Sequence, residues 1–184
     1  MSRPNLQSRV LHLDNAEHHG SLREGKPDLI VMHCTEGGTA LSTIDYLNTT
    51  HDKTASYHYI IERNGAIYRM TNPVIVAYHA GDSAWPNPIA ATSDNPDKPN
   101  KGASVNKRSV GIAWAHQGKE VLTDKQIESA LWLCGFLMDS YSIPPSRVVG
   151  HYEVSPQRKI DPQPAMEMRE WRKLLTNYLT DGAS

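Results

Sequence analysis

The dipeptide Asn64-Gly65 is the strongest local constraint on the fold of this chain. It interrupts the segment SYHYIIERNGAIYRM, residues 56–70, whose apolar and β-branched residues are typical of strands. Asn-Gly favours the tight turns that reverse a chain between two antiparallel strands. The sequence therefore predicts a local β-hairpin, and the fold must contain a sheet with at least one antiparallel pair.

Three other apolar runs are short enough to be strands. DLIVMHCT, residues 28–35, lies between Pro27 and two glycines, and SVGIAWA covers residues 109–115. SRVVG, residues 146–150, is shorter and ends on a glycine. Apolar runs without alternation are typical of strands that are buried on both faces of a sheet. We expect the first two inside the domain and the third as a short strand.

Helical periodicity marks the other ordered segments. Thr123 and Gln126 form the pattern of a capping box at the start of a helix over residues 123–141. A second helix is predicted at about 166–179, and a third from Thr39 to about residue 50. The residues expected to face inward are Ile127, Ala130, Leu131, Cys134, Leu137, Met138 and Tyr141 on the first helix, and Met168, Trp171, Leu174, Leu175 and Tyr178 on the second. Helices mixed with strands predict an α/β fold with a central mixed β-sheet flanked by helices.

The chain of 184 residues is long enough for one domain and too short for two. We expect a single domain over residues 1–184, in which residues 1–27 form an N-terminal arm without a predicted element. Residues 81–108 hold four prolines and no periodicity, and irregular loops of this length are functional or disordered. We interpret them as a functional loop that carries Trp85, with a solvated insertion as the alternative.

Charge and hydropathy exclude several classes of partner. The net charge of −1 gives no basic footprint for nucleic acid, and no apolar run approaches the roughly 18 residues that cross a bilayer. The start of the chain lacks the charged-then-apolar order of a signal peptide. We therefore expect cytoplasmic synthesis, no membrane insertion, no nucleic-acid partner and a monomer. Cys34 and Cys134 are expected as reduced buried thiols, with a single disulfide as the alternative.

The segment GHYEVSPQRKIDP, residues 150–162, places His151 ten residues before Asp161. A catalytic zinc takes three protein ligands and keeps a fourth position for water. His33, at the end of a predicted strand, could join His151 and Asp161 in such a site. The chain has nine histidines, so the residues alone do not select these two.

Five motifs together resemble one family. VMHCT, ASYHYIIERNGAIYRM, VAYHAG, SVGIAWA and GHYEVSPQRKIDP, in this order and spacing, resemble the zinc-dependent N-acetylmuramoyl-L-alanine amidases of type 2. This family includes the AmpD amidases, many phage endolysins and the peptidoglycan recognition proteins. The resemblance covers about residues 28–162, and its most specific part is the last motif. It implies a peptidoglycan or muropeptide substrate, and we expect residues 81–108 to form a wall of the substrate groove in which Trp85 stacks on sugar or peptide.

The resemblance assigns the family's functional positions to this chain. The implied zinc ligands are His33, His151 and Asp161. The family's catalytic lysine falls on Lys159, which is expected to stabilise the oxyanion that forms when the amide between N-acetylmuramic acid and L-alanine is hydrolysed. The active-site tyrosine falls on Tyr57. The histidine of the HAG motif falls on His79, whose implied role is to orient the substrate carbonyl.

One catalytic position departs from the family. AmpD-type members carry a glutamate after GI in the SVGI strand, proposed as general base, and this chain has Ala113 there. The identity of the base therefore stays open among Tyr57, Asp161 and an unidentified residue.

The departure at Ala113 also bears on the biological setting. Because the recycling enzymes carry the glutamate, we favour a phage endolysin that degrades bacterial cell wall, with a cytoplasmic anhydro-muropeptide recycling amidase as the alternative. A non-catalytic peptidoglycan-binding module is a further alternative, which the retained ligand residues disfavour. Another zinc hydrolase of cell-wall peptides is the last alternative, which the absence of an HExxH motif disfavours.

Overall fold

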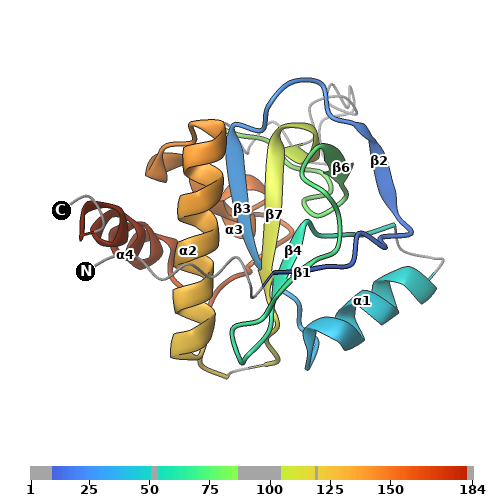
Figure 1. Ribbon diagram of the computed structural model, residues 1–184, viewed down its shortest axis with the longest axis horizontal. Coiled ribbons are helices and arrows are strands. Elements are labelled where there is room, and N and C mark those ends of the chain that lie inside the picture. Colours follow the sequence, from blue (N-terminus) through green and yellow to red (C-terminus); the bar gives the residue numbers. More distant parts are fainter. Residues whose placement is uncertain (1–9, 51–53, 87–104, 119, 182–184) are drawn as a thin grey trace.

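The computed structural model describes residues 10–50, 54–86, 105–118 and 120–181 (Figure 1). The strands are β1 (Val10–His12), β2 (His19–Leu22), β3 (Leu29–Cys34), β4 (Tyr59–Ile61), β5 (Ile67–Arg69), β6 (Ile75–Ala77), β7 (Ser109–Trp114) and β8 (Val148–Gly150). The helices are α1 (Ala40–Thr49), α2 (Asp124–Tyr141), α3 (His151–Val154) and α4 (Met168–Asp181), with 3-10 turns η3 (Val105–Arg108) and η4 (Pro145–Arg147).

Six strands form one mixed sheet in the order β1-β5-β4-β7-β3-β8, and β2 pairs with β6 in a separate two-stranded sheet. In the large sheet β4 and β5 run antiparallel, and the other pairings are parallel. Helices flank this sheet, so the predicted α/β class with a central mixed sheet is confirmed.

The two longest strands, β3 and β7, lie side by side in the middle of the sheet (Figure 1). All six residues of each strand are buried. Both strands have a hydrogen-bonded neighbour on each side, which explains why their sequences are apolar without alternation. Both predictions, and that of a short strand before Gly150, are confirmed.

The Asn64-Gly65 dipeptide does reverse the chain between β4 and β5. The Glu62 amide donates to the Ala66 carbonyl over 2.8 Å, and the Gly65 amide donates to the Glu62 carbonyl over 2.8 Å. Gly65 has φ +85°, a backbone conformation that glycine adopts without strain. The predicted hairpin is confirmed, and its strands are shorter than residues 56–70 suggested.

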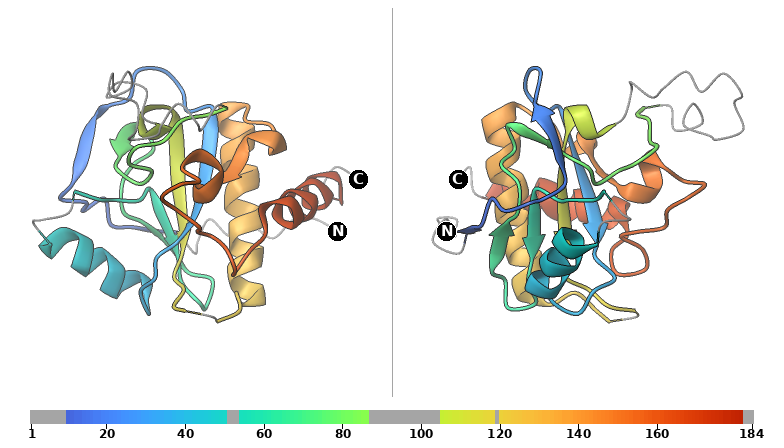
Figure 2. Two further views of the ribbon diagram at one scale, coloured as in Figure 1. Left: turned by 180° about the vertical axis from the view of Figure 1, so that it is seen from behind. Right: turned by 90° about the vertical axis from the view of Figure 1, so that its right-hand side faces the viewer.

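Helices cover both faces of the sheet, with α1 and α2 on opposite sides (Figure 2). The predicted capping box of α2 is present, because the Gln126 amide donates to Thr123 Oγ1 and the Thr123 amide donates to Gln126 Oε1, each over 3.1 Å. The main core cluster lies between the sheet and helices α2 and α4, where Trp114 of β7 meets Trp171 of α4 edge to face.

The inward faces of the helices differ in part from the prediction. On α2, Leu133 is fully buried, whereas Ile127, Leu131 and Tyr141 are only partly buried. On α4, Leu174 is 40% exposed, so its predicted inward position is wrong. When the apolar stripe of a helix is broad, the spacing of its residues does not fix the rotation of the helix about its axis. Packing against the sheet then determines which of the apolar residues are buried.

The N-terminal arm contains two strands that the sequence did not predict. β1 pairs with β5 and forms one edge of the large sheet, and β2 pairs with β6. After β2, the Arg23 guanidinium donates hydrogen bonds to the carbonyl oxygens of Pro73, Lys107 and Ser109 over 2.7–3.0 Å. These strands are short and mostly exposed, so no apolar pattern marks them in the sequence. Strand pairing and the hydrogen bonds of Arg23 hold the segment in place.

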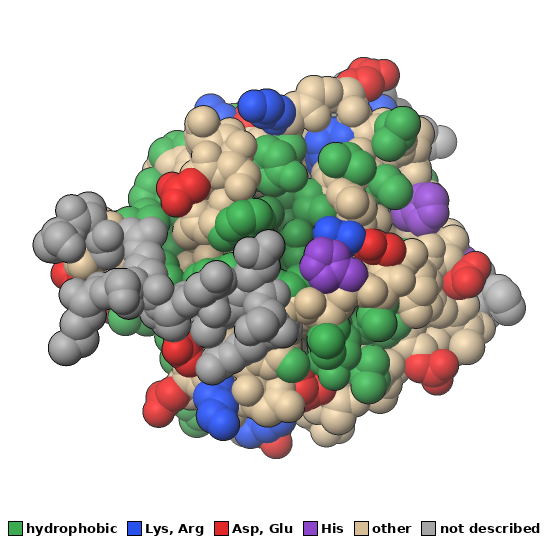
Figure 3. All heavy atoms as spheres, in the orientation of Figure 1, with side chains coloured by type: hydrophobic (Ala, Val, Ile, Leu, Met, Phe, Trp, Pro, Cys, Tyr) green, Lys and Arg blue, Asp and Glu red, His purple; other side chains and the backbone are tan. Residues whose placement is uncertain are grey.

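The two cysteines are as expected from the sequence: Cys34 and Cys134 are buried free thiols. Acidic and basic side chains are interspersed on the face shown in Figure 3, in keeping with the near-zero net charge. Within the described segments, no helix combines the length and the apolar character needed to span a membrane. Most of the predicted loop 81–108 lies outside the described residues.

Candidate metal centre

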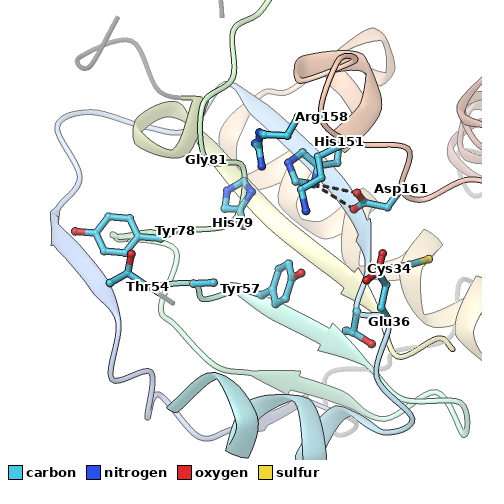
Figure 4. Close-up of a pocket in the computed structure, with 13 residues that line it drawn as sticks. Cys34, Glu36, Thr54, Tyr57, Tyr78, His79, Gly81, His151, Arg158 and Asp161 are labelled. Carbon is cyan, nitrogen blue, oxygen red and sulfur yellow. Dashed lines mark hydrogen bonds and ion pairs between the residues drawn. The ribbon is translucent and has the colours of Figure 1, made fainter. Parts of the chain in front are cut away.

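The three predicted ligands His33, His151 and Asp161 lie together at the carboxyl ends of the central strands, and Figure 4 shows two of them, His151 and Asp161, side by side. β3 and β8 are parallel neighbours, so their carboxyl ends meet there, and they bring His33 near the end of β3 close to His151 at the start of α3. The loop after α3 then returns, and the Tyr152 amide donates to the Asp161 carbonyl over 3.0 Å. Strand pairing therefore joins residues that lie 118 positions apart.

The spacing of the three side chains fits a metal ion. The Nδ1 atoms of His33 and His151 are 3.0 Å apart, and each lies 3.2 Å from the Asp161 carboxylate. Ligand atoms held tetrahedrally at roughly 2.0–2.1 Å from zinc lie about 3.3 Å from one another. Two nitrogens and one carboxylate oxygen are also a donor set that zinc accepts.

Hydrogen bonds and burial around the three side chains favour metal binding. His151 Nε2 lies 3.2 Å from the Ala80 carbonyl, which can only accept, so Nε2 carries a proton and Nδ1 is the ring nitrogen that faces His33 and Asp161. Burial, followed by the nearby His151, lowers the pKa of His33 to about 4. Burial raises the pKa of Asp161, but the adjacent His151 and His33 outweigh it and leave this pKa well below its usual range. Neutral imidazoles and an ionised carboxylate are the metal-binding forms.

A cavity of about 280 Å³ is lined by His151 and Asp161, whereas His33 is fully buried and does not line it. Its other lining residues are Cys34, Thr35, Glu36, Thr54, Ala55, Tyr57, Tyr78, His79, Gly81, Arg158 and Lys159. The cavity therefore places cationic, carboxylate and phenol groups next to two of the candidate metal ligands.

Comparison with known proteins settles the family. The family described as N-acetylmuramoyl-L-alanine amidase matches residues 23–164. The chain belongs to this family. A curated relative, the 1,6-anhydro-N-acetylmuramyl-L-alanine amidase AmpD of Haemophilus influenzae, is 30% identical over 133 residues. The matched segment is 72% of this chain and spans 63% of the length of that relative.

Solved structures of amidases share the fold. An AmpD derivative aligns with a TM-score of 0.71 at 22% identity, over 91% of this chain and 94% of that one. The endolysin LysCS from Clostridium intestinale aligns with 0.65 at 23% identity, over 91% and 95%. The amidase AmiD from Escherichia coli, solved with anhydro-N-acetylmuramic acid-L-Ala-D-gamma-Glu-L-Lys, aligns with 0.61 at 24% identity, over 82% and 58%.

Two further predicted residues line the cavity of this amidase-family chain. The Tyr57 ring meets the His33 ring, with centroids 5.2 Å apart. Burial, and then the charge of Asp161, raises the pKa of Tyr57 above its usual range, so its phenol keeps its proton. Lys159 is partly buried, and its amide donates to the Ser155 carbonyl over 3.0 Å, which places its side chain at the cavity wall.

The substrate contacts predicted for His79 and Trp85 stay predictions. His79 lines the cavity, and its two ring nitrogens each lie 3.1 Å from a protein partner, namely His33 Nε2 and Ser109 Oγ. Trp85 is partly buried against a core cluster that includes Val105 and does not line the cavity formed by the described residues. Its contact with substrate stays a prediction.

Two cavity residues were missed by the sequence reasoning. Glu36 follows the end of β3 and has φ 58°, a left-handed conformation that is unusual outside glycine. Arg158 precedes Lys159, and its Nη2 donates to the Ala80 carbonyl over 2.7 Å. Figure 4 shows Glu36 and Arg158 at opposite ends of the labelled site. Their proximity in sequence to His33 and Lys159 was the available signal.

Proposed function

We propose that this chain is a zinc-dependent N-acetylmuramoyl-L-alanine amidase, which hydrolyses the amide bond between N-acetylmuramic acid and L-alanine. The observation that carries the proposal is the convergence of His33, His151 and Asp161 next to a cavity that Lys159 lines. The solved AmiD complex supports a muropeptide as the substrate class, because that relative holds a sugar joined to L-Ala.

His33, His151 and Asp161 would hold the zinc through two nitrogens and one oxygen. When bound there, zinc would lower the pKa of water to about 7 and polarise the scissile carbonyl. Loss of metal in a binding-only relative is expected to follow from loss of a ligand, and all three ligands are present in this chain. This supports catalysis over the binding-module alternative.

Lys159 and Tyr57 act on the substrate as donors. Negative charge develops on the carbonyl oxygen during hydrolysis, and the compact ammonium of Lys159 stabilises it at the cavity wall. Tyr57 keeps its proton because burial raises its pKa, so it donates a hydrogen bond and is a poor general base. The same reasoning disfavours Asp161 as the base, because its pKa is strongly lowered.

Glu36 is the remaining carboxylate among the described residues that line the cavity. Ala113 is fully buried between strands, so this chain supplies no carboxylate from the position that AmpD-type members use. We assign to Glu36 the transfer of a proton from the attacking water to the departing nitrogen of L-alanine. Glu36→Gln should lower kcat by about 10²-fold, the effect of losing a general base, without loss of bound zinc. Unchanged kcat would exclude this role.

The biological setting has two candidates. Ala113 favours a phage endolysin that acts on polymeric cell wall, whereas the likeness to AmpD favours recycling of small anhydro-muropeptides. Turnover should be compared on intact peptidoglycan and on purified anhydro-muropeptide. An endolysin is expected to prefer the polymer, and a recycling enzyme the small substrate.

Product analysis tests the reaction itself. The zinc-loaded protein should release a free N-acetylmuramic acid moiety and a peptide that begins with L-alanine, as identified by mass spectrometry. Cleavage between two amino acids would instead identify a peptidase, and binding without any product would identify a binding module.

A further inference from the structure

A chain of buried polar groups connects the candidate metal ligand His33 to strand β7. His33 Nε2 lies 3.1 Å from His79 Nδ1, and His79 Nε2 lies 3.1 Å from Ser109 Oγ. The Ser109 hydroxyl lies 2.7 Å from the carbonyl oxygen of Val105. His33, His79, Ser109 and Val105 are each at most 7% exposed, so water does not compete for these contacts.

The carbonyl of Val105 sets the direction of every hydrogen bond in this chain. It can only accept, so the single hydroxyl proton of Ser109 is donated to it. Ser109 Oγ must then accept from His79 Nε2, which leaves His79 Nδ1 without a proton. His79 Nδ1 accepts in turn from His33 Nε2. His33 therefore carries its proton on Nε2, and its Nδ1 lone pair faces His151 and Asp161.

The backbone around His79 is shaped to hold the ring in this orientation. A Cβ atom on Gly111 of β7 would lie 2.4 Å from Cγ of His79, so the ring packs where that strand has no side chain. The amides of His79 and Ala80 donate to Oδ1 of Asn106 over 3.2 and 2.8 Å. Asn106 belongs to η3, the turn that also provides the Val105 carbonyl.

We propose that His79 and Ser109 are positioning residues that fix the Nε2-protonated tautomer of His33 and so present its Nδ1 atom to the metal. Groups that hydrogen-bond to the far nitrogen of a metal-bound histidine typically change metal affinity by about 10- to 100-fold. The metal-affinity part rests on the proposed zinc site. The tautomer part concerns the metal-free protein and stands apart from it.

Ser109→Ala tests this chain of hydrogen bonds. Without the hydroxyl, His79 Nε2 loses its acceptor, and the proton can move to His79 Nδ1. His79 would then donate to His33 Nε2, which moves the proton of His33 to Nδ1 and into the metal site. Zinc affinity, measured by competition with a chromogenic chelator, is expected to fall by about 10- to 100-fold.

Ser129→Ala is the matched control. Ser129 is also fully buried, and its hydroxyl also donates to a backbone carbonyl over 2.7 Å, that of Gly65. It lies on α2, which packs on the opposite face of the sheet from the metal centre. The control should show a similar loss of stability and unchanged zinc affinity. Equal affinity losses in the two variants would reduce Ser109 to a structural residue.

Nitrogen-15 NMR of the imidazole rings reads the tautomer directly. In the metal-free wild-type protein, His33 and His79 should both show a protonated Nε2 and an unprotonated Nδ1, and Ser109→Ala should shift both toward Nδ1 protonation. This measurement on the wild type needs no variant to fold. A wild-type His33 protonated on Nδ1 would overturn the proposal, whereas failure to bind zinc would overturn only the proposed function.

Discussion

The two faces of strand β7 carry side chains of very different size. The face toward α2 and α4 consists of large apolar residues in the main core, namely Val110, Ile112 and Trp114. The face toward the candidate metal centre consists of small residues, namely Ser109, Gly111 and Ala113. Gly111 leaves the space in which the His79 ring lies, and Ser109 holds that ring through its hydroxyl.

This difference shows how one buried strand supports stability and function at once. Large side chains remove apolar area from water on the helix side, which is the main source of folding free energy. Small side chains on the other side allow polar rings to be buried and hydrogen-bonded close to the backbone. Substitutions on the helix side should therefore change stability alone, and substitutions on the cavity side should change metal binding or turnover.

The largest effect is expected from the proposed ligands. His33→Ala, His151→Ala and Asp161→Ala should each abolish hydrolysis, because each removes one of three protein ligands. His58→Ala is the matched control, since His58 is also fully buried but bonds to the Gly111 amide and the Ile75 carbonyl. It should lower stability and keep one zinc per folded chain. Full zinc content in all three ligand variants would show that these residues are not the metal ligands.

A substitution on the helix face should act on stability alone. Trp171 is fully buried against Trp114, so Trp171→Ala should lower the free energy of unfolding by about 3–5 kcal/mol. Leu174→Ala on the same helix should change it by less than about 0.5 kcal/mol, because Leu174 is 40% exposed. Denaturant titration measures both values. Zinc affinity of the folded Trp171→Ala protein should be unchanged, and a weakened site would break the separation of the two faces.

Lys159→Ala should separate catalysis from metal binding on the cavity face. We expect kcat to fall by about 10²-fold or more with little change in KM, because the charge acts on the transition state. Arginine should rescue poorly, since a planar guanidinium cannot replace a compact ammonium. Lys173→Ala, which removes an exposed lysine of α4, is the control and should leave kcat unchanged. Normal kcat in Lys159→Ala would leave the lysine without a catalytic role.

The smallest effect is expected at Trp85. Its packing against the cluster near Val105 predicts that Trp85→Ala lowers the free energy of unfolding by about 1 kcal/mol and leaves KM for muropeptide unchanged. A several-fold rise in KM would instead support the stacking role expected from the sequence, and would place this part of the chain in the substrate groove.

The sequence predicted the elements that have a strong local signal. β3, β7 and α2 are long and apolar or well capped, and the turn at Gly65 requires a residue tolerant of positive φ. β1 and β2 were missed because strands of three or four exposed residues are ordered by their partners. Leu174 was misplaced because its spacing fits the apolar stripe although α4 turns it outward.

The metal site was predicted by motif resemblance and not by the residues alone. Burial does not distinguish the candidate ligands, because the buried histidines include His33, His58, His79, His116 and His151. His33 lies close to His151 because β3 pairs with β8. This pairing cannot be inferred from two segments that lie far apart in the sequence. The contacts of His79 with Ser109, and the presence of Glu36 in the cavity, likewise follow from the way the strands and loops pack in three dimensions.

X-ray absorption at the zinc edge of the wild-type protein, loaded with one equivalent of zinc, tests the proposed site most directly. Two imidazole nitrogens and carboxylate or water oxygens at roughly 2.0–2.2 Å are expected, without sulfur. Cys34 lines the same cavity, but its side chain belongs to the main core cluster and its Sγ donates to the Pro162 carbonyl over 3.8 Å, so we expect it not to bind the metal. A sulfur neighbour at about 2.3 Å, or no bound zinc, would contradict a site made of His33, His151 and Asp161.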